Sequence, residues 1–220
     1  MHLINVFTLL PLITLAVDTT RNPSLDTNLL TAATQLDRLN LLSSDSQWTY
    51  DFTEQPTYNF SPGGVSNANA ATFPAAIANS LTMAMINLGP CAILPPHFHP
   101  RGSNYVVAVS GNTSTFMIEE NGARVVNAIL TPRKMTIFPQ GSVHTMQNTG
   151  CENAQLVSAL SSTDAGTSNL VNNLFALPSN IVQAAFGNQA MNFNVGKIPG
   201  IGTGAAKGDA ACLTRCANGG

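Results

Sequence analysis

Pro95-Pro96-His97-Phe98-His99-Pro100-Arg101-Gly102-Ser103-Asn104 is the stretch that decides the fold, together with Pro139-Gln140-Gly141-Ser142-Val143-His144 further along the chain. Three of the four histidines lie in these two stretches, and the fourth, His2, lies near the N-terminus. Only 9% of the 220 residues are charged, so this concentration of ionisable rings indicates a shared purpose. The pattern predicts a metal site.

The spacing of the three histidines is compatible with one site. His97 and His99 are separated by one residue, so on a β-strand both side chains point to the same face. His144 follows His99 by 45 residues, enough chain for several strands and an antiparallel return to the same pocket. Taken alone, each histidine would more simply be a surface residue or a hydrogen-bonded core residue. Three neutral imidazoles together favour Mn, Fe, Co, Ni, Cu or Zn over Ca or Mg.

Short β-segments surround the two histidine stretches. After residue 80 the chain forms short apolar or alternating runs separated by turn residues, and Asn121-Gly122 between two such runs is a strong hairpin signal. The predicted strands are residues 81–88, 105–110, 114–118, 124–130, 135–138, 143–147 and 156–160. Strands this short and evenly spaced predict an all-β sandwich or barrel rather than a parallel α/β sheet.

Helical patterns flank the β-region on both sides. Leucine and alanine recur near helical spacing over residues 28–42, after a capping residue at Asp26 or Thr27. Further helices are expected at residues 169–176, capped by Ser168, and at residues 181–186, capped by Ser179 and ended by Gly187. The Gly-rich tail from residue 197 is expected to lie along the surface.

The N-terminus has the pattern of a signal peptide. Residues 6–17 are mostly apolar, and Thr14-Leu15-Ala16 offers small residues before a cleavage point, so residues 1–16 are predicted to be removed. A transmembrane anchor is the alternative, but the apolar run is too short to cross a bilayer and contains a proline. The prediction is a secreted protein, extracellular or in the cell wall.

Composition excludes some partners. The formal net charge is −2 and the chain contains no basic run, so neither nucleic acid nor an anionic membrane surface is expected to bind. The low charge and high apolar content are typical of a compact protein rather than a disordered one.

The chain has four cysteines, and an even number in a secreted chain indicates disulfides. Cys91 and Cys151 each lie near one histidine stretch, so they are expected to staple neighbouring strands. Cys212 and Cys216 are expected to pair locally in the tail. Three connectivities are open, and a zinc site built from cysteine and histidine is the alternative. Two sequons, at Asn59 and Asn112, are candidate glycosylation sites or unused surface loops.

These residues resemble a known family. The first germin motif, G(X)5HXH(X)3,4E(X)6G, is matched from His97 to Gly111, with its leading glycine displaced to Gly89. The second, G(X)5PXG(X)2H(X)3N, is matched from Pro139 to Asn148, with Arg133 in place of its leading glycine. The chain is therefore similar to the germin-like cupins, and most similar to the secreted fungal spherulin-like proteins among them.

The resemblance implies a fold and a domain layout. It implies a single cupin barrel, a double-stranded β-helix or jelly roll, with an N-terminal helix and C-terminal helices. The expected layout is a signal peptide at 1–16, an N-terminal helix and extension at 17–75, the barrel core at 76–162, and C-terminal helices and tail at 163–220. Germin-like proteins assemble through barrels and C-terminal helices, so a homo-oligomer is expected.

One position departs from the family pattern. The first motif has a metal-binding Glu where this chain has Asn104, and no Asp or Glu lies between Glu54 and Glu119 to replace it. The resemblance implies the metal ligands His97, His99, Asn104 and His144, holding one divalent transition metal per subunit: Cu, Zn or Mn. A set without an anionic ligand favours Cu or Zn over a redox-cycling Mn. Loss of metal affinity with retention of the fold is the alternative.

The strand phase also predicts the pocket. If His144 faces inward, so do Met146 and Asn148, and Val106 has the same phase as Asn104.

The resemblance implies oxalate oxidation, superoxide dismutation or no enzyme activity. A metal-dependent oxidase, dioxygenase or dismutase acting on a small molecule is one hypothesis. A non-catalytic wall- or spore-associated storage, stress or metal-scavenging protein is another, and a sugar- or small-ligand-binding cupin with a vestigial metal is a third. Arg101 is either an anion-attracting residue at the mouth of the pocket or a solvated loop charge.

Overall fold

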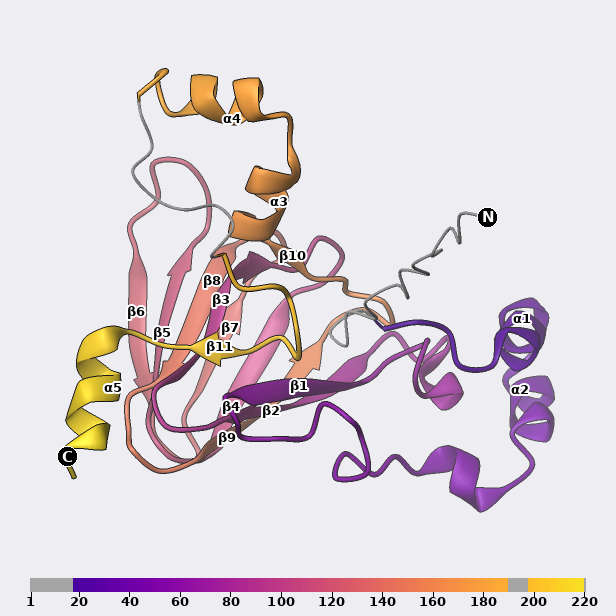
Figure 1. Cartoon of the computed structure of the whole chain (residues 1–220). Helices are drawn as coiled ribbons and strands as arrows, with labels where there is room; N and C mark the ends of the chain where they lie inside the picture. Colours follow the sequence, from indigo (N-terminus) through magenta and orange to yellow (C-terminus); the bar gives the residue numbers. More distant parts are fainter. Residues whose placement is uncertain (1–17, 190–197, 220) are drawn as a thin grey trace, which may run out of the picture.

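The computed structural model describes residues 18–189 and 198–219, in which two antiparallel sheets face one another (Figure 1). The first sheet has the order β1-β2-β9-β4-β7 and the second the order β10-β3-β8-β5-β6, with β11 added on β3. The strands are β1 (Gly63–Ala68), β2 (Thr82–Leu88), β3 (Ala92–Phe98), β4 (Asn104–Ser110), β5 (Thr113–Ile118), β6 (Val126–Leu130), β7 (Met135–Phe138), β8 (Val143–Asn148), β9 (Ala154–Leu160), β10 (Ser168–Asn169) and β11 (Ala206–Lys207). The predicted all-β sandwich or barrel is confirmed.

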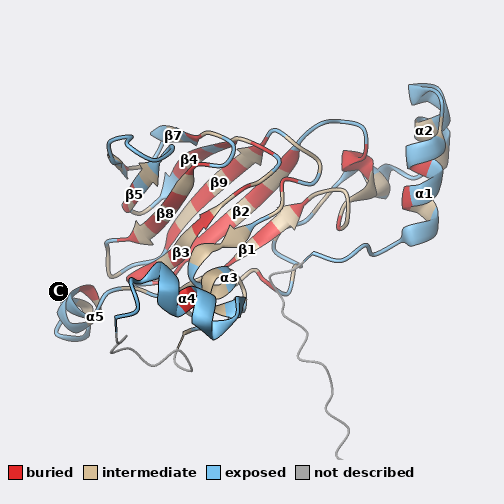
Figure 2. Ribbon diagram, turned by 90° about the horizontal axis from the view of Figure 1, so that it is seen from above, coloured by how far each residue is buried: buried red, intermediate tan, exposed pale blue. Residues whose placement is uncertain are grey.

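The core lies between the two sheets, and period-two alternation puts it there. Every second residue of β8 and β9 is buried, which appears as stripes across these strands in Figure 2. The apolar side chains that meet between the sheets are Ile86, Leu88, Ala92, Leu94, Val106, Ala108, Leu130, Phe138, Met146, Ala154 and Leu156. This core is a rigid support for the polar side chains at one end of the barrel.

Four strands were not among those predicted: the two-residue strands β10 and β11, and the longer β1 and β3. β1 pairs with β2 along its whole length, although Gly63 and Gly64 weaken its strand pattern. β3 carries His97, but it also contains Pro95 and Pro96. Proline is unfavourable within a strand, so the sequence of β3 does not predict one. With β1, β10 and β11, the sheets extend beyond the predicted limits of 76–162. The predicted Asn121-Gly122 hairpin is confirmed, since β5 and β6 pair and Gly122 has a φ of +89°.

The predicted helix over residues 28–42 is wrong, because the chain forms two helices there. α1 spans Pro23–Thr31 and α2 spans Gln35–Leu41. Thr34 and Asp37 form a capping box that starts a new helix and ends the continuous pattern. Two short 3-10 helices follow, at Asp45–Trp48 and Pro74–Ala76. α1 and α2 lie to one side of the barrel and pack on the second of these turns (Figure 1).

Three helices follow the barrel. α3 spans Leu170–Ala176 and α4 spans Ser179–Ala185, close to the predicted ranges, but their caps are Asn169 and Pro178 rather than the two predicted serines. Gly187 ends α4 with a φ of +67°, as expected. The tail forms a third helix, α5 (Ala210–Ala217), instead of only a surface coil.

The disulfides differ from the expected pairs. Cys91 bonds to Cys212, and Cys151 bonds to Cys216, with Cα–Cα distances of 5.8 and 5.2 Å. The two tail cysteines are four residues apart on α5, so both lie on one face of that helix and each meets a barrel cysteine. Gly208 permits this approach, because a Cβ there would lie 1.9 Å from the carbonyl oxygen of Cys91. All four thiols are used, so the alternative zinc site is excluded.

The predicted signal peptide, residues 1–16, lies outside the described residues. Among the residues that are described, no helix has the length and apolar character needed to cross a membrane.

Candidate metal centre

The three histidines converge at one end of the barrel. His97 on β3 pairs in register with His144 on β8, and His99 follows directly after β3. Their ring centroids lie 4.3 Å apart for His97 and His144, and 5.2 Å apart for each pair that includes His99. All three side chains are at most 8% exposed. The predicted cluster of three histidines is therefore present as a buried group.

A bulge in β3 sets the direction of His97. Leu94 pairs with Met146, and His97 pairs with His144. Between these two pairs β3 contains one more residue than β8, which is a β-bulge. Without that residue, the odd spacing between Leu94 and His97 would put them on opposite faces. With it, both point into the barrel, Leu94 into the core and His97 into the site.

Hydrogen bonds join the two histidine stretches directly. The backbone N–H of Gly141 donates to the carbonyl of His99 at 3.0 Å. The backbone N–H of Gln140 donates to Ser103 Oγ at 3.1 Å, and its side chain donates to the carbonyl of Pro100 at 2.9 Å. Gly141 has a φ of +81°, which glycine adopts at little cost. The bend before β8 thus holds His99 and His144 in one place.

Each imidazole has its proton fixed on Nδ1. His97 Nδ1 donates to the carbonyl of Pro95 at 2.7 Å, His99 Nδ1 to that of Gly166 at 2.6 Å, and His144 Nδ1 to that of Ser142 at 2.9 Å. A carbonyl oxygen only accepts, so all three Nδ1 atoms carry hydrogen and all three Nε2 atoms are unprotonated, each with a lone pair. This is the tautomer that ligates a metal through Nε2, with the ring held by its other nitrogen.

One ring nitrogen at the inner face of the cluster, His144 Nε2, lacks a hydrogen-bond partner. One ring nitrogen from each histidine lies within 4.8 Å of those of the other two. His144 Nε2 is buried and has no partner, although Phe138 stacks on the ring at 4.2 Å. A buried polar atom without a partner is costly, and a shared metal ion would remove that cost. The donor set therefore fits a transition metal.

Burial keeps the three imidazoles neutral. It lowers the pKa of His97 to about 4, helped by the nearby His99, and it lowers the pKa of His144 to about 2, helped by His97. It also lowers the pKa of His99, against the hydrogen bond to Gly166. Neutral imidazole is the form that binds a metal, so protons compete little at neutral pH.

The metal-free protein should lose stability on acidification because of His97. Its folded pKa of about 4 lies below the unfolded value of 6.5, so the unfolded chain takes up the proton first as the pH falls. The stabilisation is complete above pH 6.5 and is lost between 6.5 and 4, at a cost of about 3 kcal/mol. Urea unfolding of chelator-treated protein at a series of pH values measures it. His97→Gln should make this slope shallower without removing it, because burial also lowers the pKa of His144 and of His99. Equal slopes for the two proteins would contradict the prediction.

Asn104 comes from the opposite sheet, on β4, and is 2% exposed. Its Nδ2 lies 3.3 Å from His99 Nε2, and its Oδ1 accepts a hydrogen bond from Ser158 on β9. The amide therefore turns its nitrogen toward the histidines. Ligation through Oδ1 requires rotation of the amide by half a turn, and the Ser158 hydroxyl permits this because it accepts as well as donates. Ser158 is a site residue that the sequence analysis missed.

His97 and His99 border a cavity of about 100 Å³ between the sheets. Met146 lines it, as predicted, together with Ile86, Leu94 and Leu160. Val106 does not line it, because its side chain is buried in the apolar core. Apolar and polar side chains both line the cavity, and His97, His99, Asn104 and Ser158 are among the polar ones.

Asn148 is also not a pocket residue. It lies four residues beyond His144, at the other end of β8. Its Nδ2 donates to the carbonyls of Leu88, Gly89 and Glu152 at 3.2, 2.8 and 2.7 Å, and its Oδ1 accepts from the backbone of Gly150 at 2.9 Å. The inward phase was predicted correctly, but the residue clamps two loops at the far end of the barrel.

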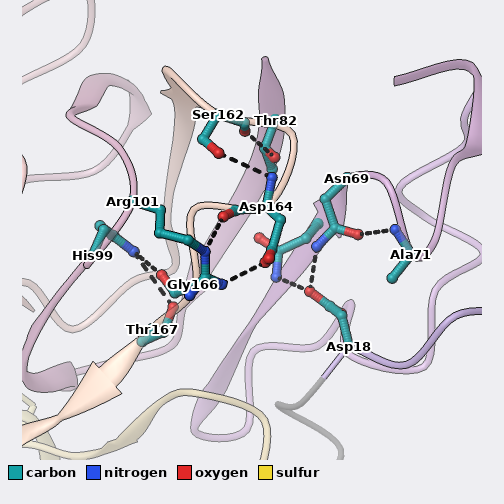
Figure 3. Close-up of polar contacts among 11 residues, drawn as sticks. Asp18, Asn69, Ala71, Thr82, His99, Arg101, Ser162, Asp164, Gly166 and Thr167 are labelled. Carbon is teal, nitrogen blue, oxygen red and sulfur yellow. Dashed lines mark hydrogen bonds and ion pairs between the residues drawn. The ribbon is translucent and has the colours of Figure 1, made fainter. Parts of the chain in front are cut away.

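Arg101 is not a free cation at the mouth of the site. Its Nη2 lies 2.7 Å from Asp164 Oδ1, and its Nε donates to the backbone carbonyl of Asp164 at 2.7 Å (Figure 3). The partner, more than sixty residues away in sequence, carries an equal and opposite charge. An anion approaching the histidines therefore meets a neutralised arginine.

Comparisons with known proteins agree with this geometry. A family model described as Cupin matches residues 51–192. Spherulin-1A of Physarum polycephalum is 33% identical over 163 residues, which cover 73% of this chain and 66% of the spherulin. Germin-like protein 1-1 of Oryza sativa subsp. japonica is 30% identical over 134 residues, which cover 59% and 62%. The chain thus spans slightly less than two thirds of the length of these relatives.

A solved structure agrees in fold. A recombinant oxalate oxidase in complex with glycolate superposes with a TM-score of 0.60 over 81% of this chain and 85% of the other, at 17% identity. Identity this low supports the fold alone. The family match, the relatives and the histidine cluster together establish that the chain belongs to the cupin family, as one of its germin-like members.

Proposed function

We propose that this chain is a secreted germin-like cupin that binds one divalent transition metal through the Nε2 atoms of His97, His99 and His144. The observation that carries the proposal is the shared tautomer. Three carbonyls hold the three Nδ1 protons outward, so three lone pairs face one buried point. Such an arrangement is costly without a metal, since His144 Nε2 has no other partner.

Asn104 is the fourth ligand in this proposal, through Oδ1 after rotation of its amide. The resulting set of three imidazoles and one amide carries no negative charge. Imidazole-rich sets bind Cu and Zn well, whereas a carboxylate supports harder metals such as Mn. We therefore place Cu and Zn ahead of Mn at this site. When bound, the metal supplies a Lewis-acidic or redox centre to a small molecule in the cavity.

The function that the site supports best is a metal-dependent oxidoreductase, an oxidase, dioxygenase or dismutase, acting on a small molecule. The cavity of about 100 Å³ limits the reacting part of a ligand to a few atoms, and its apolar walls exclude bulk water. Oxalate conversion is less well supported, because that chemistry in the family relies on the carboxylate ligand that Asn104 replaces.

A second candidate is a non-catalytic wall- or spore-associated protein that stores or scavenges metal. The observation that favours it is the scarcity of proton-transfer groups at the site. Among the residues that line the metal cavity, Asp18 is the one carboxylate, and the histidines are committed to the metal. Turnover of a small oxidisable substrate by the metal-loaded protein would separate the two candidates.

Asn104→Glu tests the ligand assignment. Protein produced in medium with balanced Mn, Cu and Zn should contain about one metal per chain, chiefly Cu or Zn. The variant should shift the bound metal toward Mn, because Glu adds the missing negative charge. Elemental analysis of both purified proteins measures this. A parent protein without metal contradicts the proposed function, and an unchanged metal profile in the variant contradicts the role of Asn104.

Several observations support secretion. Both pairs of cysteines are bonded, which suits an oxidising compartment. Asn112 is exposed in the turn between β4 and β5 and is accessible for glycosylation. Asn59 is half-buried, and its amide nitrogen donates to the carbonyl of Thr57 at 3.2 Å, so it is the less favourable sequon. We propose Asn112 as the modified site.

Self-association is also proposed. Each sheet exposes large apolar side chains on its outward face: Tyr105, Val109, Met135 and Ile137 on β4 and β7, and Phe116, Ile118 and Ile129 on β5 and β6. An apolar face of this kind is typical of a contact between chains. Light scattering of the purified protein should give a mass that is a multiple of the single chain.

A further inference from the structure

The metal cavity opens beside a second, larger cavity. This outer cavity has a volume of about 570 Å³, against about 100 Å³ for the metal cavity. Both are lined by Asp18, Asn67, His99, Leu160 and Thr167. A ligand that reaches the histidines through the outer cavity therefore passes these five residues, and Asp18 is the one carboxylate among them.

Two asparagines hold the Asp18 carboxylate in this position. Asn67 Nδ2 and Asn69 Nδ2 both donate to Asp18 Oδ2, at 2.9 and 2.7 Å (Figure 3). Both bonds fall on the same oxygen, and Oδ1 has no hydrogen bond to any described residue. One oxygen is thus anchored, and the other is available to a ligand.

The orientation of the Asn69 amide is fixed by its neighbours. The backbone N–H groups of Ala71 and Thr72 donate to Asn69 Oδ1 at 2.9 and 3.2 Å. These donors force the Asn69 amide to present its nitrogen to Asp18. The N-terminal segment is held further along by Arg21, whose backbone N–H donates to the carbonyl of Ala71 at 2.9 Å. Asp18 is therefore held in place at the wall, although the residue is exposed.

The lining of the outer cavity carries more carboxyl groups than cations, although Arg21 also acts electrostatically on Asp18. Its lining contains the carboxyl groups of Asp18, Asp26 and Asp164 and the guanidinium of Arg101. Arg101 is neutralised by its ion pair with Asp164. Asp26 is 7% exposed and its Oδ1 has no hydrogen-bond partner, so burial raises its pKa. Burial also raises the pKa of Asp18, against the hydrogen bonds from the two asparagines.

This arrangement opposes the charge of the metal. A divalent ion held by neutral ligands attracts anions strongly, whereas a carboxylate on the path to it repels them. We propose that Asp18 is a specificity-determining residue that disfavours anionic ligands at the metal, so that the site takes neutral or cationic small molecules that donate a hydrogen bond to Asp18 Oδ1. The inference rests on the proposed metal site.

The test compares the binding of an anion to the metal-loaded parent protein and to Asp18→Asn. Thiocyanate remains a monoanion at all working pH values, and its binding to the Cu(II)- or Co(II)-loaded protein is followed by visible absorption. At neutral pH and low ionic strength, the variant should bind thiocyanate about 3- to 10-fold more tightly. The gain should shrink in high concentrations of a non-ligating salt, because salt screens the charge. Imidazole, a largely neutral ligand at pH 8, should gain nothing.

Matched variants make the result specific. Asp45→Asn removes the same charge from an exposed position that lines neither cavity, so it should leave the thiocyanate affinity unchanged. Asp18→Ser removes the charge with a different side chain and should repeat the gain, which covers the case that Asp18→Asn does not fold. Equal thiocyanate affinities in the metal-loaded parent and Asp18 variants would overturn the inference, as would a gain that salt does not reduce. A parent protein that binds no metal would instead overturn the proposed function.

Discussion

His144→Gln should abolish stable metal retention while the protein stays folded. His144 Nε2 is buried, has no hydrogen-bond partner and lies at the centre of the ring cluster. Loss of an outer hydrogen-bond partner already costs a metal site about 10- to 100-fold in affinity, and loss of a ligand should cost more. Metal per chain after dialysis, together with competition against a chelator of known affinity, measures the effect.

Met146→Leu is the control for His144→Gln. Met146 is the next inward residue of β8 and lines the same cavity, but it is not one of the imidazole ligands. Its replacement conserves volume, so this variant should retain one metal per chain. The metal-free His144→Gln protein should unfold at a similar urea concentration to the metal-free parent. Full metal retention by His144→Gln would contradict the assignment of the site.

Removal of one disulfide, by Cys91→Ala with Cys212→Ala, should lower the free energy of unfolding by about 4 kcal/mol. The bond closes a loop with a sequence separation of 121 residues, which restricts the unfolded chain strongly. It also ties α5 to the barrel, next to the close contact at Gly208. The denaturant midpoint of the oxidised double variant, compared with that of the parent, measures the loss.

The pairing of the four cysteines can be tested separately from their effect on stability. Peptide mapping without reduction should recover Cys91 linked to Cys212 and Cys151 linked to Cys216. Cys151→Ala with Cys216→Ala should cost a similar amount of stability, because each bond closes a loop of nearly the same length when the other bond is intact. Recovery of a Cys91–Cys151 peptide would contradict the structure, and so would a double variant as stable as the parent.

Most of the fold was predictable from local patterns. Alternation located β2, β4, β5, β7, β8 and β9 to within two residues at each end, because one face of each strand is buried. The failures have local reasons too. Pro95 and Pro96 hide β3, which tolerates them because a bulge interrupts its pairing there. The single N-terminal helix was wrong because Thr34 and Asp37 form a cap inside an otherwise helical pattern.

The metal site was predictable only in part. The histidine residues and their common face follow from their spacing, and the structure brings all three together. Met146 follows from the same phase, but Val106 and Asn148 show that an inward side chain serves the core or a loop clamp unless it lies at the right end of the barrel. Ser158 has no signal of its own, since a serine in a strand is common.

The sequence by itself determined the clustered histidines, the amide at position 104 and the all-β architecture, because each of these rests on the identity or the spacing of nearby residues. Only the tertiary structure decided the fixed tautomers, the crossed disulfides, the neutralised Arg101 and the place of Asp18 beside the metal cavity. These features depend on contacts between segments that are far apart along the chain. Local periodicity carries no information about which distant segments meet, so the charge that faces the metal site becomes visible only when the chain is folded.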